Sequence, residues 1–159
     1  MVAHIRLGID QGGGSIVPDE DAGTLGRAHA SGWVESVDQA KEQILTYLAG
    51  YAALVAVGGA GDDDASLGAV DDFERAGELV AAWSLGTLDE WKARAVALMA
   101  EPSNIKAVRL IADRLLALGE VDGEWADVLV EYADCKCTDA DLAGYQAWRD
   151  SCSGRASCN

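Results

Sequence analysis

The sequence predicts an α+β fold that is mainly helical, with a small N-terminal β region followed by a helical bundle. Half of the 159 residues are apolar and only two are prolines, which leaves material for a core and long stretches in which helices can form. The first 35 residues differ from the rest, because they are rich in glycine and carry short apolar segments. The length corresponds to one domain.

The N-terminal region has the pattern of short strands. Residues 2–7 alternate between apolar and polar at a period of two, as in a half-buried strand. The segment 11–15, with its three glycines, is typical of a turn, and we expect further strands at 15–17 and 24–29.

Apolar residues at helical spacing and helix-boundary signals predict the remaining elements. The predicted helices cover residues 36–57, 69–85, 88–100, 104–118 and 123–132, with a further one at 139–150. Ser36, Thr87 and Ser103 have the positions of N-caps, and Glu90 completes a capping box with Thr87. Gly119 has the position of a C-terminal glycine cap. The run Asp62–Asp64 is expected in an exposed loop.

We divide the chain into three parts of one compact domain. Residues 1–35 form the β region, residues 36–132 the helical core, and residues 133–159 a tail that contains all four cysteines. The tail follows the strongly periodic part of the chain and lies at a terminus, so truncation after Ala133 is expected to leave the core folded.

The charge is strongly acidic, with 27 acidic against 12 basic residues and a net charge of −15. Phosphate contacts require lysine and arginine, so direct nucleic-acid binding is not expected. An acidic surface keeps a chain soluble, and it also attracts a protein with a basic surface, as a nucleic-acid mimic does. We found neither an apolar stretch long enough to span a membrane nor a secretory leader, and we expect a cytoplasmic protein without membrane contact.

Three segments, in order, resemble the helical part of the FtsH-type zinc metalloprotease peptidase domain. Residues 40–54 read AKEQILTYLAGYAAL, residues 68–76 read GAVDDFERA, and an apolar pattern runs from 97 to 123. The resemblance covers about residues 24–132 and omits the ATPase module. It implies that Asp72, in the G-A-x-x-D motif, is the third zinc ligand.

The rest of that zinc site is absent from the sequence. Such a peptidase needs an H-E-x-x-H helix, whose histidines bind zinc and whose glutamate is the general base. The sequence has only His4 and His29, which we interpret as structural residues. Asp72 is therefore interpreted as vestigial, with a role in the first turn of a helix. We expect no cofactor and no peptidase activity, and zinc only if the chain has ligands of an unrecognised kind.

The cysteines allow three interpretations. Cys135, Cys137, Cys152 and Cys158 are free thiols, pair as disulfides, or bind a metal. Their spacing does not match the usual C-x-x-C zinc pairs, and a cytoplasmic location favours free thiols.

The leading functional hypothesis is a non-catalytic, acidic protein-binding domain, such as an inhibitor or adaptor. Its candidate partner-binding residues are Asp62, Asp63, Asp64, Asp71 and Glu74, which are close in sequence. The first alternative is a zinc-dependent, peptidase-like hydrolase with unrecognised ligands. The second is a structural module that forms homo-oligomers through apolar surface.

Overall fold

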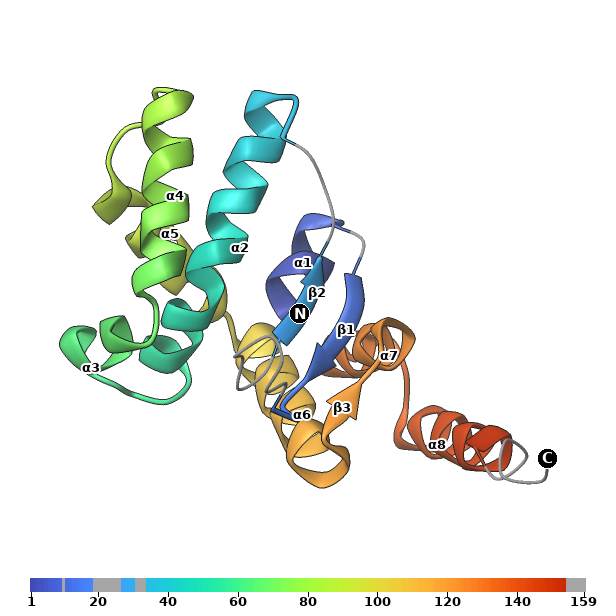
Figure 1. The fold of residues 1–159 in the computed structure, drawn as a ribbon. Coiled ribbons are helices and arrows are strands. Elements are labelled where there is room, and N and C mark those ends of the chain that lie inside the picture. The colour runs from blue at the N-terminus through green and yellow to red at the C-terminus, as the bar shows by residue number, and fades with distance from the viewer. Residues whose placement is uncertain (10, 19–26, 31–33, 154–159) are drawn as a thin grey trace.

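The protein is a mainly helical α+β domain, as the sequence predicts. The computed structural model describes residues 1–9, 11–18, 27–30 and 34–153. In Figure 1, α2 (Val37–Ala56), α4 (Val70–Ala82) and α5 (Leu88–Met99) lie on one side of a small sheet and α7 (Gly123–Ala133) lies on the other, while α6 (Pro102–Leu118) lies below it. Within the described residues, no helix combines the length and apolarity that crossing a bilayer requires.

The first element is helix α1 (Val2–Leu7), so the strand predicted at 2–7 is wrong. A six-residue alternation fits one face of a short helix as well as a strand, and here tertiary contacts decide. Val2, Ala3 and His4 are buried against the core, and Gly8 ends the helix in the left-handed conformation. Burial lowers the pKa of His4 to about 4, so this side chain is neutral at pH 7.

Three strands form an antiparallel sheet in the order β2-β1-β3. Strand β1 (Gln11–Ser15) occupies the segment that was predicted as a turn. The strand predicted at 15–17 is therefore wrong beyond Ser15, because β1 ends there. Gly13 has φ +99°, and a Cβ there would lie 2.7 Å from the Asp122 Cα, so this strand needs the glycine. Strand β2 (Arg27–Ala30) overlaps the predicted 24–29, of which 24–26 lie outside the described residues. Strand β3 (Glu120–Val121) completes the sheet.

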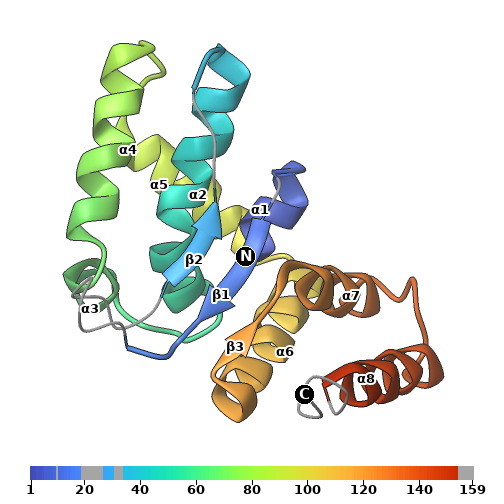
Figure 2. The ribbon, with the colours of Figure 1, turned by 45° about the vertical axis from the view of Figure 1, so that its right-hand side comes forward.

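Helix α2 (Val37–Ala56) is the centre of the first helical group. It packs most extensively against α5 (Leu88–Met99) and α4 (Val70–Ala82), which lie beside it in Figure 2. Its Ile44 and Leu48 are fully buried. Ser36 caps it by accepting a hydrogen bond from the Gln39 backbone N–H at 3.2 Å, and Thr87 and Glu90 form the predicted capping box of α5. The expected loop at 62–64 is instead the first turn of α3 (Asp62–Leu67), because aspartates favour a helix N-terminus.

The second helical group joins α6 (Pro102–Leu118) to α7 (Gly123–Ala133) through β3. Helix α6 begins before the predicted N-cap Ser103, because Pro102 fits the first helical position. Gly119 ends it with φ +83°, as predicted. Asp122 caps α7 through the Trp125 N–H at 2.8 Å, and the Trp125 side chain is fully buried.

An ionic cluster connects the beginning of the chain to the end of α7. The Arg6 guanidinium donates to both Asp134 carboxylate oxygens, at 2.7 and 2.5 Å, and its Nε donates to the Asn104 Oδ1 at 2.5 Å. Asn104 is fully buried and donates in turn to the Leu98 carbonyl at 2.7 Å. The tail was defined as residues 133–159, so it includes Asp134. This residue forms an ion pair with Arg6 in the N-terminal part of the chain.

Helix α8 (Asp139–Ser153) lies at the edge of the molecule beside α7 (Figure 1). Tyr145 stacks on Trp125 with ring centroids 5.0 Å apart, and the Arg149 guanidinium pairs with Asp122. The helix extends three residues beyond the predicted end at 150. Helix α8 thus contacts the rest of the molecule mainly through α7 and its N-cap.

Truncation after Cys137 is expected to leave a cooperative unfolding transition with a Tm only a few degrees lower, since α8 lies at the edge of the molecule and packs on it mainly through the Tyr145–Trp125 stack and the Arg149–Asp122 ion pair. Truncation after Ala133 is expected to lower the Tm further, because it also removes Asp134 from Arg6. Circular dichroism melts of the two truncated chains and the full chain measure both shifts. Equal Tm values for the two truncated chains would contradict a stabilising role for Asp134.

Candidate functional site

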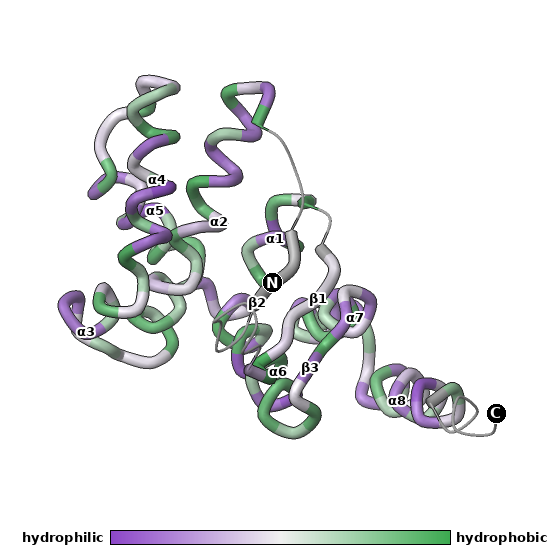
Figure 3. The backbone as a smooth tube through the Cα atoms, in the orientation of Figure 1, coloured by the Kyte–Doolittle hydropathy of each residue, from purple (hydrophilic) through white to green (hydrophobic). Residues whose placement is uncertain are grey.

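The acidic residues predicted to bind a partner lie on two consecutive helices. Asp62, Asp63 and Asp64 form the first turn of α3, and Asp71 and Glu74 lie in the first two turns of α4. Only Gly68 and Ala69 separate the two helices, and all five side chains are exposed. The N-terminal half of α3 is accordingly among the hydrophilic parts of the chain in Figure 3.

Two large apolar side chains are exposed between these carboxylates. Leu67, the last residue of α3, is 79% exposed, and Val70, the first residue of α4, is 64% exposed. A single exposed apolar residue is ordinary, but these two are three residues apart in the sequence and have acidic residues before and after them, which is the composition of an interface with an apolar centre and a charged rim. We call this surface, formed by Asp62, Asp63, Asp64, Leu67, Val70, Asp71 and Glu74, the acidic face.

An aromatic cluster anchors the first residue of the acidic face. The Tyr51 hydroxyl donates a hydrogen bond to the Asp62 carboxylate, which raises the pKa of Tyr51 to about 12. Phe73 packs edge-on against Tyr51 at 5.2 Å between ring centroids. The Lys92 ammonium lies 3.9 Å from the Phe73 ring centroid and 5.3 Å from that of Tyr51. Tyr51, Phe73 and Lys92 lie far apart in the sequence, on three different helices, so no local pattern predicts this cluster.

The charge of the acidic face is not neutralised by ion pairs within the part of the chain that the structure describes. Asp63, Asp64, Asp71 and Glu74 make no salt bridge with the described residues. Lys92 lies over aromatic rings, and the Arg75 guanidinium lies 6.0 Å from the Tyr47 ring centroid. The negative potential of these carboxylates therefore extends into the solvent.

Asp72, the predicted third zinc ligand, lies in the first turn of α4 and is half-buried. Burial raises the pKa of its carboxyl, and the nearby Arg75 partly opposes that rise. Across the described ranges, no three histidine, cysteine, aspartate or glutamate residues are grouped so that they could hold a metal ion. His4 is buried in α1, and the His29 side chain lies outside what is described. Among the residues that the structure describes, Asp72 thus has no companions that would complete the tetrahedral zinc site that the resemblance implies.

The described cysteines are free thiols. Cys135 and Cys152 are exposed, and Cys137 is half-buried, with its thiol 3.9 Å from the Val128 carbonyl oxygen. Burial is the largest influence on Cys137 and raises its pKa, so the unreactive thiol form is favoured. Cys158 lies outside the described residues. Among the described residues, these three cysteines form no disulfide and belong to no group that could hold a metal ion, so the free thiol is the interpretation that fits them.

Fold and site together define a mainly helical α+β domain with one exposed acidic face. Comparisons with models of protein families, with curated proteins and with solved structures found no match.

Proposed function

We propose that this chain is a non-catalytic protein-binding domain that acts, as an adaptor or an inhibitor, through the acidic face. The observation that carries the proposal is the exposure of Leu67 and Val70 between five exposed carboxylates. Protein interfaces combine an apolar centre, which supplies most of the affinity, with a polar rim. The partner would present an apolar side chain to the centre and basic residues to the rim.

Electrostatics supports a basic protein as the partner. The chain carries a net charge of −15, and the carboxylates of the acidic face lack ion-pair partners among the described residues. Such a field accelerates encounter with a positively charged surface and repels the phosphates of nucleic acid. The same charge opposes contact between two copies of the chain, which is why self-association is not our leading proposal.

The resemblance to the FtsH-type peptidase domain does not extend to the residues that carry out catalysis in that family. The sequence lacks H-E-x-x-H, and Asp72 has no second and third ligand grouped with it among the residues described. Hydrolysis at zinc requires at least three protein ligands and a general base. A binding role requires only the surface.

We expect the acidic face to control the capture of a partner from an extract of the native host. The variant Asp62→Asn/Asp63→Asn/Asp64→Asn removes three charges, whereas Asp113→Asn/Glu120→Gln/Glu131→Gln removes three exposed charges elsewhere. The immobilised wild-type chain and the second variant should both retain a basic protein from the extract. The first variant, which lacks the three aspartates of α3, should not retain it. Retention should also weaken from about 0.01 to 0.15 M salt, because the Debye length falls from roughly 30 to 8 Å.

A further variant, Leu67→Ser/Val70→Ser, tests the apolar centre with the captured protein. Replacement of Leu67 and Val70 by serine is expected to raise the dissociation rate, whereas the charge variant lowers the association rate. Binding that is indifferent to salt and to both sets of substitutions would exclude the acidic face. Tight binding to plain duplex DNA would overturn the charge argument.

A further inference from the structure

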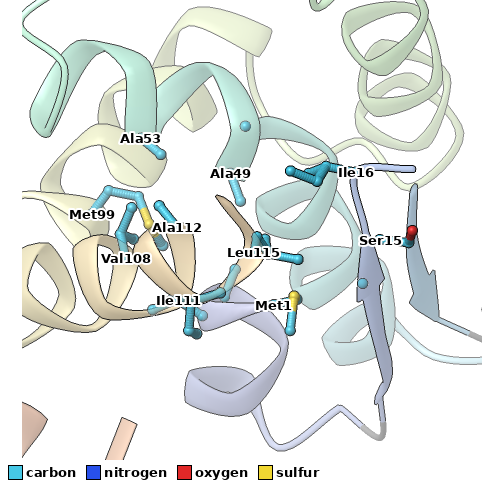
Figure 4. Close-up of a pocket in the computed structure, with 14 residues that line it drawn as sticks. Met1, Ser15, Ile16, Ala49, Ala53, Met99, Val108, Ile111, Ala112 and Leu115 are labelled. Carbon is cyan, nitrogen blue, oxygen red and sulfur yellow. The ribbon is translucent and has the colours of Figure 1, made fainter. Parts of the chain in front are cut away.

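A second feature of the molecule is an apolar pocket away from the acidic face. It has a volume of about 440 Å³ and lies between the start of α1, the end of β1, α2 and α6. In Figure 4, Ala49 and Ala53 of α2 lie on one side of the pocket, and Val108 and Ala112 of α6 lie on the other. Pockets of this size and composition are typical of small-molecule sites.

The lining offers almost no polar group to a ligand. Ser15 supplies the single polar side chain among the described lining residues. Its hydroxyl already accepts a hydrogen bond from the Val17 N–H at 3.0 Å and donates one to the Gly119 carbonyl at 3.4 Å. No charged side chain lines the pocket, and burial lowers the pKa of the Met1 α-amino group, which favours the neutral amine. A buried ionic group would therefore have no strong partner there.

The shape of the lining suits a chain more than a compact ring. The lining residues on α6 run from Val108 to Leu115, which corresponds to about 10 Å at the helical rise of 1.5 Å per residue. The pocket is also roughly three times as large as the ~150 Å³ apolar cavity that binds benzene. On the α2 side, Gly50 has no side chain and Ala53 has only a methyl group, so the pocket is not blocked along this length.

Both methionines of the chain, Met1 and Met99, line the pocket (Figure 4). Methionine is flexible and polarisable, and it adapts to ligands of different shape better than branched side chains do. Ile16, also in the lining, is 41% exposed, so the pocket opens to the solvent beside it.

We propose that this pocket binds an uncharged, unbranched alkyl chain. The volume, the apolar lining, the engaged Ser15 hydroxyl and the length along α6 all fit that class of ligand. The proposal is independent of the acidic face, because the two surfaces share no residue.

The test uses butanol, hexanol, octanol and decanol as probes of the full-length protein. Each added methylene is expected to tighten binding about threefold to fourfold until the pocket is filled. The methionine methyl NMR signals report the titration, since both methionines lie in the pocket. An affinity that does not increase with chain length, or methyl signals that decanol does not shift, would overturn the proposal.

The substitution Gly50→Leu adds a side chain at the wall of the pocket. A Cβ built there meets no atom within 4 Å, and leucine is a far better helix former than glycine, so Gly50→Leu should fold. We expect it to weaken decanol binding by about tenfold or more. Ala53→Phe fills the same space and should have the same effect if Gly50→Leu fails to fold.

Two control variants separate filling from helix stabilisation. Gly50→Ala improves α2 with a single methyl group, and Gly144→Leu makes the same substitution at an open, exposed position of α8. Both should bind decanol within about twofold of the wild type, because neither takes up the alkyl volume. Equal affinity of Gly50→Leu, Ala53→Phe and the controls would place decanol elsewhere and refute the pocket.

Discussion

Replacing Trp125 with alanine is expected to lower the free energy of unfolding by about 3–5 kcal/mol, which corresponds to a Tm roughly 10–15 °C lower. Trp125 is 1% exposed and is the largest fully buried side chain. It stacks on Tyr145, and the Arg114 guanidinium lies 5.1 Å from its ring centroid. Alanine would leave a cavity between α6, α7 and α8 and remove these contacts together.

Trp148→Ala is the matched control, because it removes the same side chain from a position that is 54% exposed. It loses only the tilted contact with Tyr145 at 5.5 Å, and the free energy of unfolding should change by about 0.5 kcal/mol or less. Urea unfolding followed by circular dichroism measures both variants. If they lose similar stability, Trp125 is not the packing centre described here.

The second large effect is expected for Arg6→Met, which should lower the free energy of unfolding by about 2–3 kcal/mol. Methionine retains much of the volume but leaves the Asp134 carboxylate and the Asn104 amide oxygen without the guanidinium. Losing one member of a fully buried pair costs more, but the Arg6 and Asp134 side chains are 19% and 13% exposed. Lys41→Met breaks an exposed ion pair with Asp38, 2.8 Å between the charged atoms, and should change stability far less.

The Arg6 effect should depend on pH. Hydrogen bonds from Arg6 hold the pKa of Asp134 well below its usual range. A carboxyl whose pKa is lower in the folded state stabilises the protein fully above its unfolded pKa of about 4, and the stabilisation is lost as the pH falls through the folded pKa. The difference between wild type and Arg6→Met should therefore be constant from about pH 7 to 5 and shrink in more acidic solution. A difference that grows on acidification would contradict the assignment.

The elements that the sequence predicted well are those with local signals. The N-cap Ser36, the capping box of Thr87 and Glu90, and the glycine cap Gly119 each lie next to the backbone groups they satisfy, and the helices they bound were placed within a few residues. Helix α1 was mispredicted because its conformation depends on burial of His4 and on Asp134, which is 128 residues from Arg6.

In the candidate sites too, the features with a local sequence signal were predicted, and those that depend on contacts between distant residues were not. The five carboxylates of the acidic face were predicted and are exposed, since a run of aspartates has no other stable place. Its apolar centre was not predicted, because Leu67 and Val70 have the ordinary appearance of core residues in the sequence. The alkyl pocket joins residues from five elements that are far apart in the chain, so no local sequence pattern predicts it. Asp72 was correctly placed at the start of a helix, but its zinc role remains a property of the resemblance alone.

The pairing of Arg6 with Asp134 also has a consequence for the order of events during synthesis. A six-residue helix such as α1 does not persist on its own in water. Its polar partners Asn104 and Asp134 follow Arg6 by 98 and 128 residues in the chain. Helix α1 therefore leaves the ribosome well before α6 and α7, and the emerging chain must keep the apolar residues of α1 from other associations until those two helices are complete.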